Sequence, residues 1–227
     1  MTKIKLCGLR RLEDIETANL LKPDYIGFVF AKKSKRYISP EEATVLKKRL
    51  EEVNALYKQE ISESKDNQNN SKLENVIKAV GVFVNEEAGK VAELLNAGII
   101  DLAQLHGSED EEYIRRLRNL TDKPIIQAFK IEKKEDLIKA EKSTADHILL
   151  DAGAGDGMVF NWELLKGFER PYFLAGGLNP QNVGEAVRKL NPYGVDVSSG
   201  IETDGFKDPV KMQKFVETVG RYAQYST

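Results

Sequence analysis

Cysteine and histidine are scarce in this chain of 227 residues, which holds one cysteine, Cys7, and two histidines, His106 and His147. A single thiol cannot form an internal disulfide, and these residues are too few to build a zinc cluster. We therefore expect no structural metal.

The chain also lacks a strong charge imbalance and a long apolar run. Its 34 Lys and Arg residues face 36 Asp and Glu residues, for a formal net charge of -2. No global basic field would attract nucleic-acid phosphates. No stretch approaches the apolar length that spans a bilayer, and the first residues do not resemble a signal peptide. We expect a cytoplasmic protein with no nucleic-acid or membrane partner.

The sequence does contain an alternation of short apolar runs and longer amphipathic segments. The apolar runs are rich in Ile, Val, Leu and Phe and are bounded by turn residues, as is typical of buried parallel strands. The predicted strands are 3–9, 25–30, 78–85, 102–107, 124–131, 147–153, 171–178 and 194–201. The predicted helices are 11–22, 40–60, 87–98, 110–120, 134–143, 162–168, 180–190 and 209–224.

Eight strand–helix alternations predict an α/β fold, a (β/α)8 TIM barrel in a single domain, with a doubly wound open sheet as the alternative. An open sheet would leave edge strands, and no predicted strand carries the charges that protect an edge. The count therefore favours closure. Residues 57–74 break the rhythm because they are polar, and we expect a mobile insertion on the face opposite the catalytic loops.

Side-chain alternation places polar groups near the strand ends. In the first strand Lys3, Lys5 and Cys7 share one face, while Ile4 and Leu6 share the other. Because buried lysine is rarely mere packing, we assign the lysine face to the barrel lumen. Later strands add Gln104, His106, Asp151, Asp196 and Ser198. The active sites of TIM barrels lie at the carboxyl ends of the strands, so we expect a site there.

Two glycine-bearing loops follow the seventh and eighth predicted strands, "LAGGLNPQNV" (174–183) and "VDVSSGIE" (195–202). Glycine lets backbone N–H groups approach an anion closely, and these loops often hold a phosphate in such barrels. The phosphate-binding candidates are Gly176, Gly177, Ser199 and Gly200. The loop "AKKSKRYIS" (31–39) holds Arg36, which is either part of a solvated basic loop or a clamp for an acidic group.

The residues alone leave several roles open. A lone cysteine such as Cys7 is most often buried packing, and Asp151 could cap a loop. For His106, satisfied packing in the barrel is the more common role. His147 begins a strand, so we expect nothing catalytic from it, and Trp162 is expected to anchor a helix against the barrel.

Taken together, these stretches resemble the phosphoribosylanthranilate isomerase family. "KIKLCGLRRLED", "YIGFVFAKKSKRYISPEEA", "GVFVNE", "LAQLHG", "ILLDAGAGDG", "LAGGLNPQNV" and "GVDVSSGIE" occur in the order and spacing of that family. The resemblance covers nearly the whole chain except 57–74.

The resemblance implies that Cys7 is a general base and Asp151 a general acid. It implies that Arg36 seats the anthranilate carboxylate and that the backbone of 175–178 and 197–200 holds the phosphate. We group His106 and Asp196 with Arg36 as candidate substrate-binding side chains.

The implied reaction is the Amadori rearrangement of N-(5'-phosphoribosyl)anthranilate, in which an aldosylamine becomes an aminoketose. One acid and one base suffice, so we expect no cofactor. Cys7 gains as a base if Lys5 or Arg36 favours its thiolate, and Asp151 acts as an acid near neutrality only if burial raises its pKa. We expect a monomer rather than a dimer. Whether an aminoaldose of histidine synthesis is also a substrate stays open.

Three departures from the family pattern are Gln127, Met158 and Asn161, where other members often carry lysine, lysine and aspartate. Because of these departures, the sequence does not predict the contacts around Asp151. The alternatives are a sugar-phosphate epimerase, indole-glycerol-phosphate synthase, or a barrel that binds a phosphorylated metabolite without catalysis. An epimerase would need metal ligands, the synthase would need a strand-end lysine, and a binding barrel has no need of the Cys7 and Asp151 pair.

Overall fold

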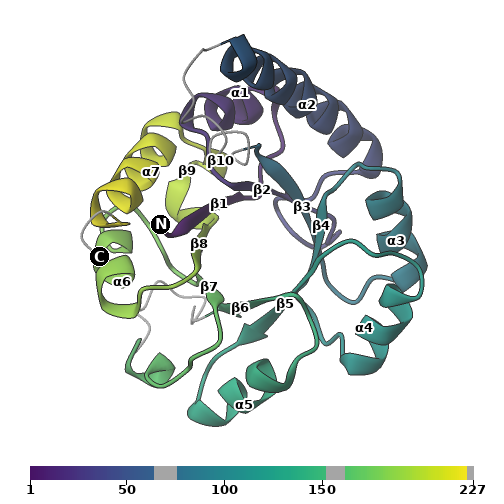
Figure 1. Cartoon of the computed structure of the whole chain (residues 1–227), viewed down its shortest axis with the longest axis vertical. Coiled ribbons are helices and arrows are strands. Elements are labelled where there is room, and N and C mark those ends of the chain that lie inside the picture. Colours follow the sequence, from purple (N-terminus) through teal and green to yellow (C-terminus); the bar gives the residue numbers. More distant parts are fainter. Residues whose placement is uncertain (64–75, 152–161, 224–227) are drawn as a thin grey trace.

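The computed structural model describes residues 1–63, 76–151 and 162–223. Eight parallel strands close into a barrel in chain order, with the helices around it (Figure 1). The strands are β1 Lys3–Cys7, β2 Tyr25–Val29, β3 Lys78–Phe83, β4 Leu102–Leu105, β5 Ile125–Lys130, β6 His147–Asp151, β7 Tyr172–Ala175 and β8 Gly194–Val197. A two-stranded antiparallel hairpin follows, made of β9 Glu202–Thr203 and β10 Phe206–Lys207.

The α-helices are α1 Leu12–Leu21, α2 Pro40–Glu63, α3 Ala88–Asn96, α4 Glu111–Arg118, α5 Lys134–Lys142, α6 Val183–Leu190 and α7 Pro209–Ala223. The part of the chain that the structure describes also holds two short 3-10 helices, η2 Trp162–Leu165 and η3 Ser199–Ile201. No helix in these described parts of the chain is long and apolar enough to cross a membrane.

The barrel closes where its last strand pairs with its first. β8 pairs with β1 in parallel from Lys3↔Gly194 to Leu6↔Val197. The predicted (β/α)8 barrel in a single domain is therefore confirmed, and the open-sheet alternative is wrong. Apart from the strand ends, two elements differ from the prediction. The helix predicted over 162–168 is only the one-turn η2, and the β9–β10 hairpin was not predicted.

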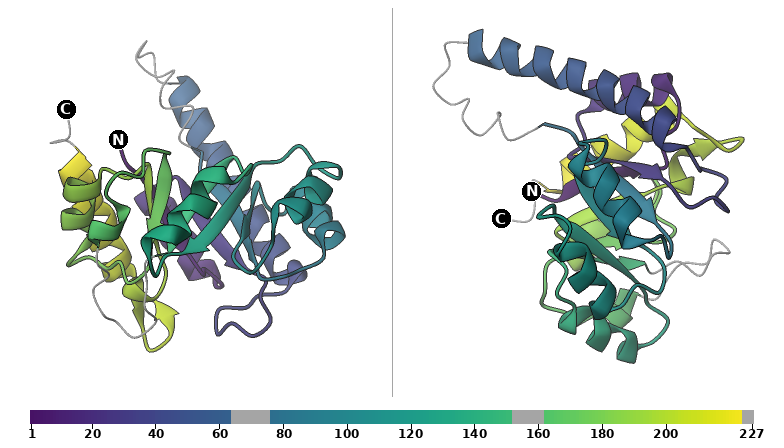
Figure 2. Two further views of the ribbon diagram at one scale, coloured as in Figure 1. Left: turned by 90° about the horizontal axis from the view of Figure 1, so that it is seen from below. Right: turned by 90° about the vertical axis from the view of Figure 1, so that its right-hand side faces the viewer.

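The start of α2 shows how local sequence sets an element boundary. Glu42 N donates to Ser39 Oγ at 3.2 Å, and Ser39 N donates to Glu42 Oε2 at 2.7 Å, which together form a capping box. Pro40 takes the first helical position, where its missing N–H costs nothing. The end of α2 projects beyond the barrel on the side of the N-terminus (Figure 2). The predicted insertion at 57–74 begins within this helix, and residues 64–75 lie outside the described residues.

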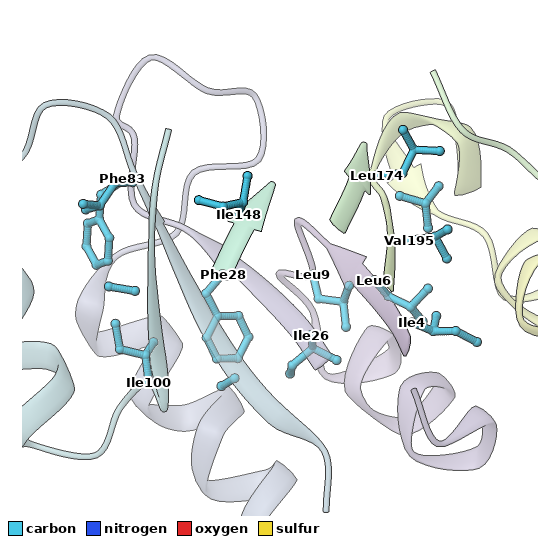
Figure 3. Packing of buried hydrophobic residues seen from close by; sticks show 14 of the residues in the cluster. Ile4, Leu6, Leu9, Ile26, Phe28, Phe83, Ile100, Ile148, Leu174 and Val195 are labelled. Carbon is cyan, nitrogen blue, oxygen red and sulfur yellow. The ribbon is translucent and has the colours of Figure 1, made fainter. Parts of the chain in front are cut away.

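The two larger apolar clusters of the barrel lie on opposite faces of its sheet, and a third, small one joins Cys7, Val29 and Val82. The largest one lies between the strands and the helices and includes Ile4, Leu6 and Val195, which lie close together in Figure 3. The second one fills the lumen and consists of Tyr25, Val80, Leu102, Ile126, Leu149, Phe173 and Ala175. In β1 the residues with even numbers thus point outward, and Lys5 is buried on the opposite face, as the alternation predicts.

The β9–β10 hairpin is tied to the loops after β1 and β2. The ring of Phe206 lies under the guanidinium groups of Arg10 and Arg11, at 4.7 and 4.8 Å. Arg10 also donates to the carbonyl of Lys35 at 2.8 Å and to that of Gly205 at 3.0 Å. The hairpin therefore fixes loops at the carboxyl end of the barrel, where the candidate site lies.

Candidate active site

Cys7 is the last residue of β1 and is 7% exposed at the carboxyl end of the barrel. Gly27 of β2 makes room for it, because a Cβ at that position would lie 2.7 Å from Cys7 Sγ. Gly8 follows with φ +81°, a left-handed conformation that favours glycine, and a Cβ there would lie 2.5 Å from Arg36 Cδ. The two glycines thus let the thiol and the Arg36 side chain approach the end of β1.

A buried ion pair lies beneath the thiol. Lys5 is 0% exposed, and its Nζ donates to Asp196 Oδ1 at 2.9 Å. Burial alone would lower the pKa of Lys5, but on balance the pKa is raised, chiefly by the neighbouring Asp196, so the ammonium keeps its charge. The predicted lumenal lysine and strand-end aspartate are therefore brought together, with the Asp196 carboxylate bound to Lys5.

Burial also decides the state of the thiol. It raises the pKa of Cys7, and the lowering effect of Lys5 is smaller. The condition set out from the sequence, a thiolate favoured by neighbouring cations, is therefore not met. The thiol is neutral at rest, and its thiolate would be a strong base.

Asp151, the last residue of β6, lies at the end of a chain of contacts with two polar residues from the end of β4. His106 Nε2 lies 3.2 Å from Asp151 Oδ2, and Gln104 Nε2 lies 2.9 Å from His106 Nδ1. Both ring nitrogens of His106 therefore have protein partners. The sequence placed these three side chains at one end of the barrel, but it did not indicate this chain of contacts.

The guanidinium group of Arg36 is already paired with a carboxylate of the protein. Its Nε and Nη2 donate to the two carboxylate oxygens of Glu202 at 2.6 and 2.7 Å, and this pairing raises the pKa of Arg36. Lys207 Nζ donates to the same carboxylate at 2.6 Å and to the Ser198 carbonyl at 3.0 Å. Burial lowers the pKa of Lys207. Sequence reasoning missed Glu202 and Lys207, although Glu202 ends the motif "VDVSSGIE".

The two glycine loops lie side by side. Gly176 and Gly177 have φ values of +93° and +65°, which favour glycine. A Cβ at Gly200 would lie 2.0 Å from the carbonyl oxygen of Leu178, so only glycine allows this approach of one loop to the other. In the described parts of the chain, the N–H groups of Gly176 and Gly177 donate to no backbone carbonyl. These amides can receive an anion.

The remaining candidates lie away from this cluster. Gln127 faces the helices, where its Nε2 donates to the Glu109 carbonyl at 2.8 Å and its Oε1 accepts from Ser143. This departure therefore lies apart from Asp151, while Met158 and Asn161 lie outside the described residues. His147 is at the opposite end of the barrel with its ring stacked on Tyr193, 5.8 Å between centroids. Trp162 packs against the outer core. No group of three His, Cys, Asp or Glu residues within 1–63, 76–151 and 162–223 could hold a metal ion.

Sequence comparisons identify relatives of the whole chain. The model of the family described as N-(5'phosphoribosyl)anthranilate (PRA) isomerase matches residues 62–218. An N-(5'-phosphoribosyl)anthranilate isomerase of Thermoanaerobacter sp. (strain X514) is 47% identical over 96% of this chain and 98% of its own length. One from Endomicrobium trichonymphae is 43% identical over 96% of this chain and 97% of its own.

Solved structures agree. A monomeric form of the dimeric phosphoribosylanthranilate isomerase of Thermotoga maritima superposes with a TM-score of 0.76 at 32% identity, over 97% of this chain and all of that chain (100%). Another structure of phosphoribosylanthranilate isomerase holds reduced 1-(o-carboxyphenylamino)-1-deoxyribulose 5-phosphate. It superposes with a TM-score of 0.74 at 32% identity, over 97% of this chain and 100% of that one.

Proposed function

Because this chain belongs to the N-(5'-phosphoribosyl)anthranilate isomerase family, we propose that Cys7 and Asp151 are the general base and general acid of its reaction. The chain is an isomerase of tryptophan biosynthesis with a phosphorylated small-molecule substrate. The alternatives from other barrel families, and that of a non-catalytic barrel, are set aside on this ground. The observation that carries the proposal is that the two residues end β1 and β6, at the same end of one closed barrel.

The reaction converts N-(5'-phosphoribosyl)anthranilate into 1-(2-carboxyphenylamino)-1-deoxy-D-ribulose 5-phosphate. Asp151 gives a proton to the ribose ring oxygen as the bond from that oxygen to C1' breaks, which leaves a protonated imine. Cys7 then removes the proton from C2', and the resulting enolamine tautomerises to the ketone. Both proton transfers are general acid–base steps.

The raised pKa of Cys7 has two opposite effects on this base. It lowers the fraction of thiolate at neutral pH, and it raises the basicity of the thiolate that does form. Proton removal from C2' needs a strong base even after the neighbouring carbon carries an iminium charge. Burial of the Cys7 thiol supplies that basicity, and the charged Lys5 offsets only part of it.

The other predicted site residues would hold the substrate. Arg36 uses Nε and Nη2 for Glu202, which leaves Nη1 for the anthranilate carboxylate. The backbone N–H groups of Gly176, Gly177, Ser199 and Gly200 would bind the phosphate, as the open amides and the left-handed glycines support. We assign Asp196 to holding Lys5 beneath the thiol rather than to direct contact with the substrate.

Activity measurements on two variants test the acid–base pair. Phosphoribosylanthranilate is fluorescent, so its disappearance is followed against spontaneous hydrolysis. Cys7→Ala and Asp151→Asn should each lower kcat by about 10²- to 10⁴-fold while substrate binding and circular dichroism are retained. Asp122→Asn, an exposed carboxylate outside the site, is the matched control and should leave kcat unchanged. Wild-type turnover by Cys7→Ala would remove Cys7 from the mechanism.

We also propose that this protein is cytoplasmic and monomeric. Its proposed organisation is a single domain over 1–227 with an insertion at 57–74. A relative from Thermotoga maritima is dimeric, so the assembly of this chain is decided by light scattering on the purified protein. A mass near 25.5 kDa is expected. Twice that mass would contradict the monomer.

A further inference from the structure

The side chains of Gln104, His106 and Asp151 form one continuous chain of hydrogen bonds at the carboxyl end of the barrel. We propose that Gln104 and His106 are positioning residues that hold the carboxyl group of Asp151 in one orientation for proton transfer. The inference rests on the proposed role of Asp151 as general acid, and it assigns a task to two residues that need not touch the substrate.

Gln104 decides which nitrogen of the His106 ring carries the proton. Its amide Nε2 faces His106 Nδ1 at 2.9 Å, and because this group is a donor we assign the accepting role to Nδ1. In a neutral imidazole the proton then sits on Nε2, which faces Asp151 Oδ2 at 3.2 Å and donates to it. The amide therefore converts His106 into a fixed donor toward the acid.

The burial of Gln104 gives a second, independent observation. The residue is 1% exposed, and its Oε1 has no hydrogen-bond partner in the described parts of the chain. A buried polar atom left unpaired is a cost to stability, and such exceptions call for a functional reason. The oxygen of the Gln104 amide thus has no hydrogen bond, while its nitrogen contacts the His106 ring.

The contact has a direct consequence for proton transfer. His106 Nε2–H, bound to Oδ2 of Asp151, holds the carboxyl group that carries the transferable proton. That proton goes to the ribose ring oxygen as its bond to C1' breaks and the bonding electrons move onto the oxygen. Asp151 becomes a carboxylate, and the N–H of His106 stabilises the new charge. No proton of His106 moves during the step.

Another charged group acts on the same carboxylate from the neighbouring strand. Lys130, the last residue of β5, is coupled electrostatically to Asp151 and is bound to Glu132. The Lys130 ammonium is exposed, and solvent screens its effect. His106, in contrast, contacts the carboxyl group directly and can therefore hold its orientation.

The tautomer can be measured without turnover, because the chain has only two histidines. In protein labelled with 15N-histidine, His147→Gln identifies the signals of His106. In the ligand-free wild type we expect protonated Nε2 and unprotonated Nδ1. In Gln104→Glu the new carboxylate can only accept, so Nδ1 should become protonated. Gln104→Met, which has no amide, should give a mixture of tautomers and serves if Gln104→Glu does not fold.

Kinetics test the consequence for the acid. His106→Leu removes the donor and should lower kcat by about tenfold to a hundredfold, with KM changed less than about threefold, since one lost donor to a developing charge costs up to about 10²–10³ in an enclosed site. His106→Gln keeps an N–H near the Nε2 position and should restore most of kcat. His147→Gln is the matched control and should retain wild-type kinetics.

The outcomes separate the two proposals. A protonated Nδ1 in the wild type, or wild-type kcat in His106→Leu, would overturn the positioning role. Absence of turnover by a wild type that shows the expected tautomer would overturn the proposed function alone.

Discussion

Replacing Lys5 by methionine tests the ion pair beneath Cys7. Methionine has a similar volume and no charge, so the change removes the ammonium and little packing. The Lys5 side chain is fully buried and Asp196 nearly so, with Nζ and Oδ1 2.9 Å apart. The variant would therefore leave a buried carboxylate without its cation.

The expected loss is large. Removing one partner of a buried ion pair costs about 3–5 kcal/mol, because the other charge stays desolvated. For a chain of 227 residues each kcal/mol lowers Tm by about 2–4 °C. Lys5→Met should therefore lower Tm by about 6–20 °C. The double variant Lys5→Met/Asp196→Asn has no buried charge at this place and should recover most of the loss.

A double-mutant cycle measures this coupling. Urea unfolding of the wild type, Lys5→Met, Asp196→Asn and the double variant gives four free energies of unfolding, from which the interaction energy follows. Two results would refute the reasoning. One is a loss below about 1 kcal/mol in each single variant, the magnitude of an exposed pair. The other is a double variant whose loss equals the sum of the single losses.

Two further predictions concern the charges around Cys7 and Arg36. Since Cys7 is the only cysteine, the pH dependence of its labelling by iodoacetamide, followed by mass spectrometry, reports its pKa. We expect an apparent pKa above the ordinary value of about 8.5, and a still higher one in Lys5→Met. A labelling midpoint below about 8.5 would contradict the effect of burial. For Glu202, burial alone would raise the pKa, but Arg36 and Lys207 lower it on balance. The Glu202 carboxylate therefore stabilises the fold above the unfolded pKa of about 4.3. This contribution to stability is lost as the pH falls through the lower pKa of the folded state. Glu202→Gln should therefore be less stable than the wild type at pH 7, with the difference shrinking toward pH 3, and an equal difference at both pH values would contradict this.

Periodicity was sufficient for the barrel because eight buried parallel strands are apolar, short and separated by amphipathic helices. Each predicted strand overlaps an observed one, yet the carboxyl ends were set too late, as in 194–201 against Gly194–Val197. Residues there turn into η3 while keeping strand-like composition. The β9–β10 hairpin was missed because each of its strands has only two residues, too few for any period to show.

The state of the candidate site could not be predicted in the same manner. The pattern placed Cys7 near Lys5, but whether the cation or burial governs the thiol depends on how closely the barrel packs around it. In the structure burial prevails. For Arg36 the sequence offered a solvated loop or a substrate clamp, and the side chain instead meets Glu202 of the unpredicted hairpin.

The sequence by itself determined the closed barrel and the strand ends that carry the thiol, the carboxyl group and the glycine loops, because both follow from periodicity within short segments. Only the tertiary structure decided how the charges pair. Lys5 meets Asp196 across 191 positions of sequence, Arg36 meets Glu202 across 166, and His106 meets Asp151 across 45. Such partners come within hydrogen-bond distance only when the eight strands close, since closure brings the first strand beside the last and gathers all strand ends at one rim.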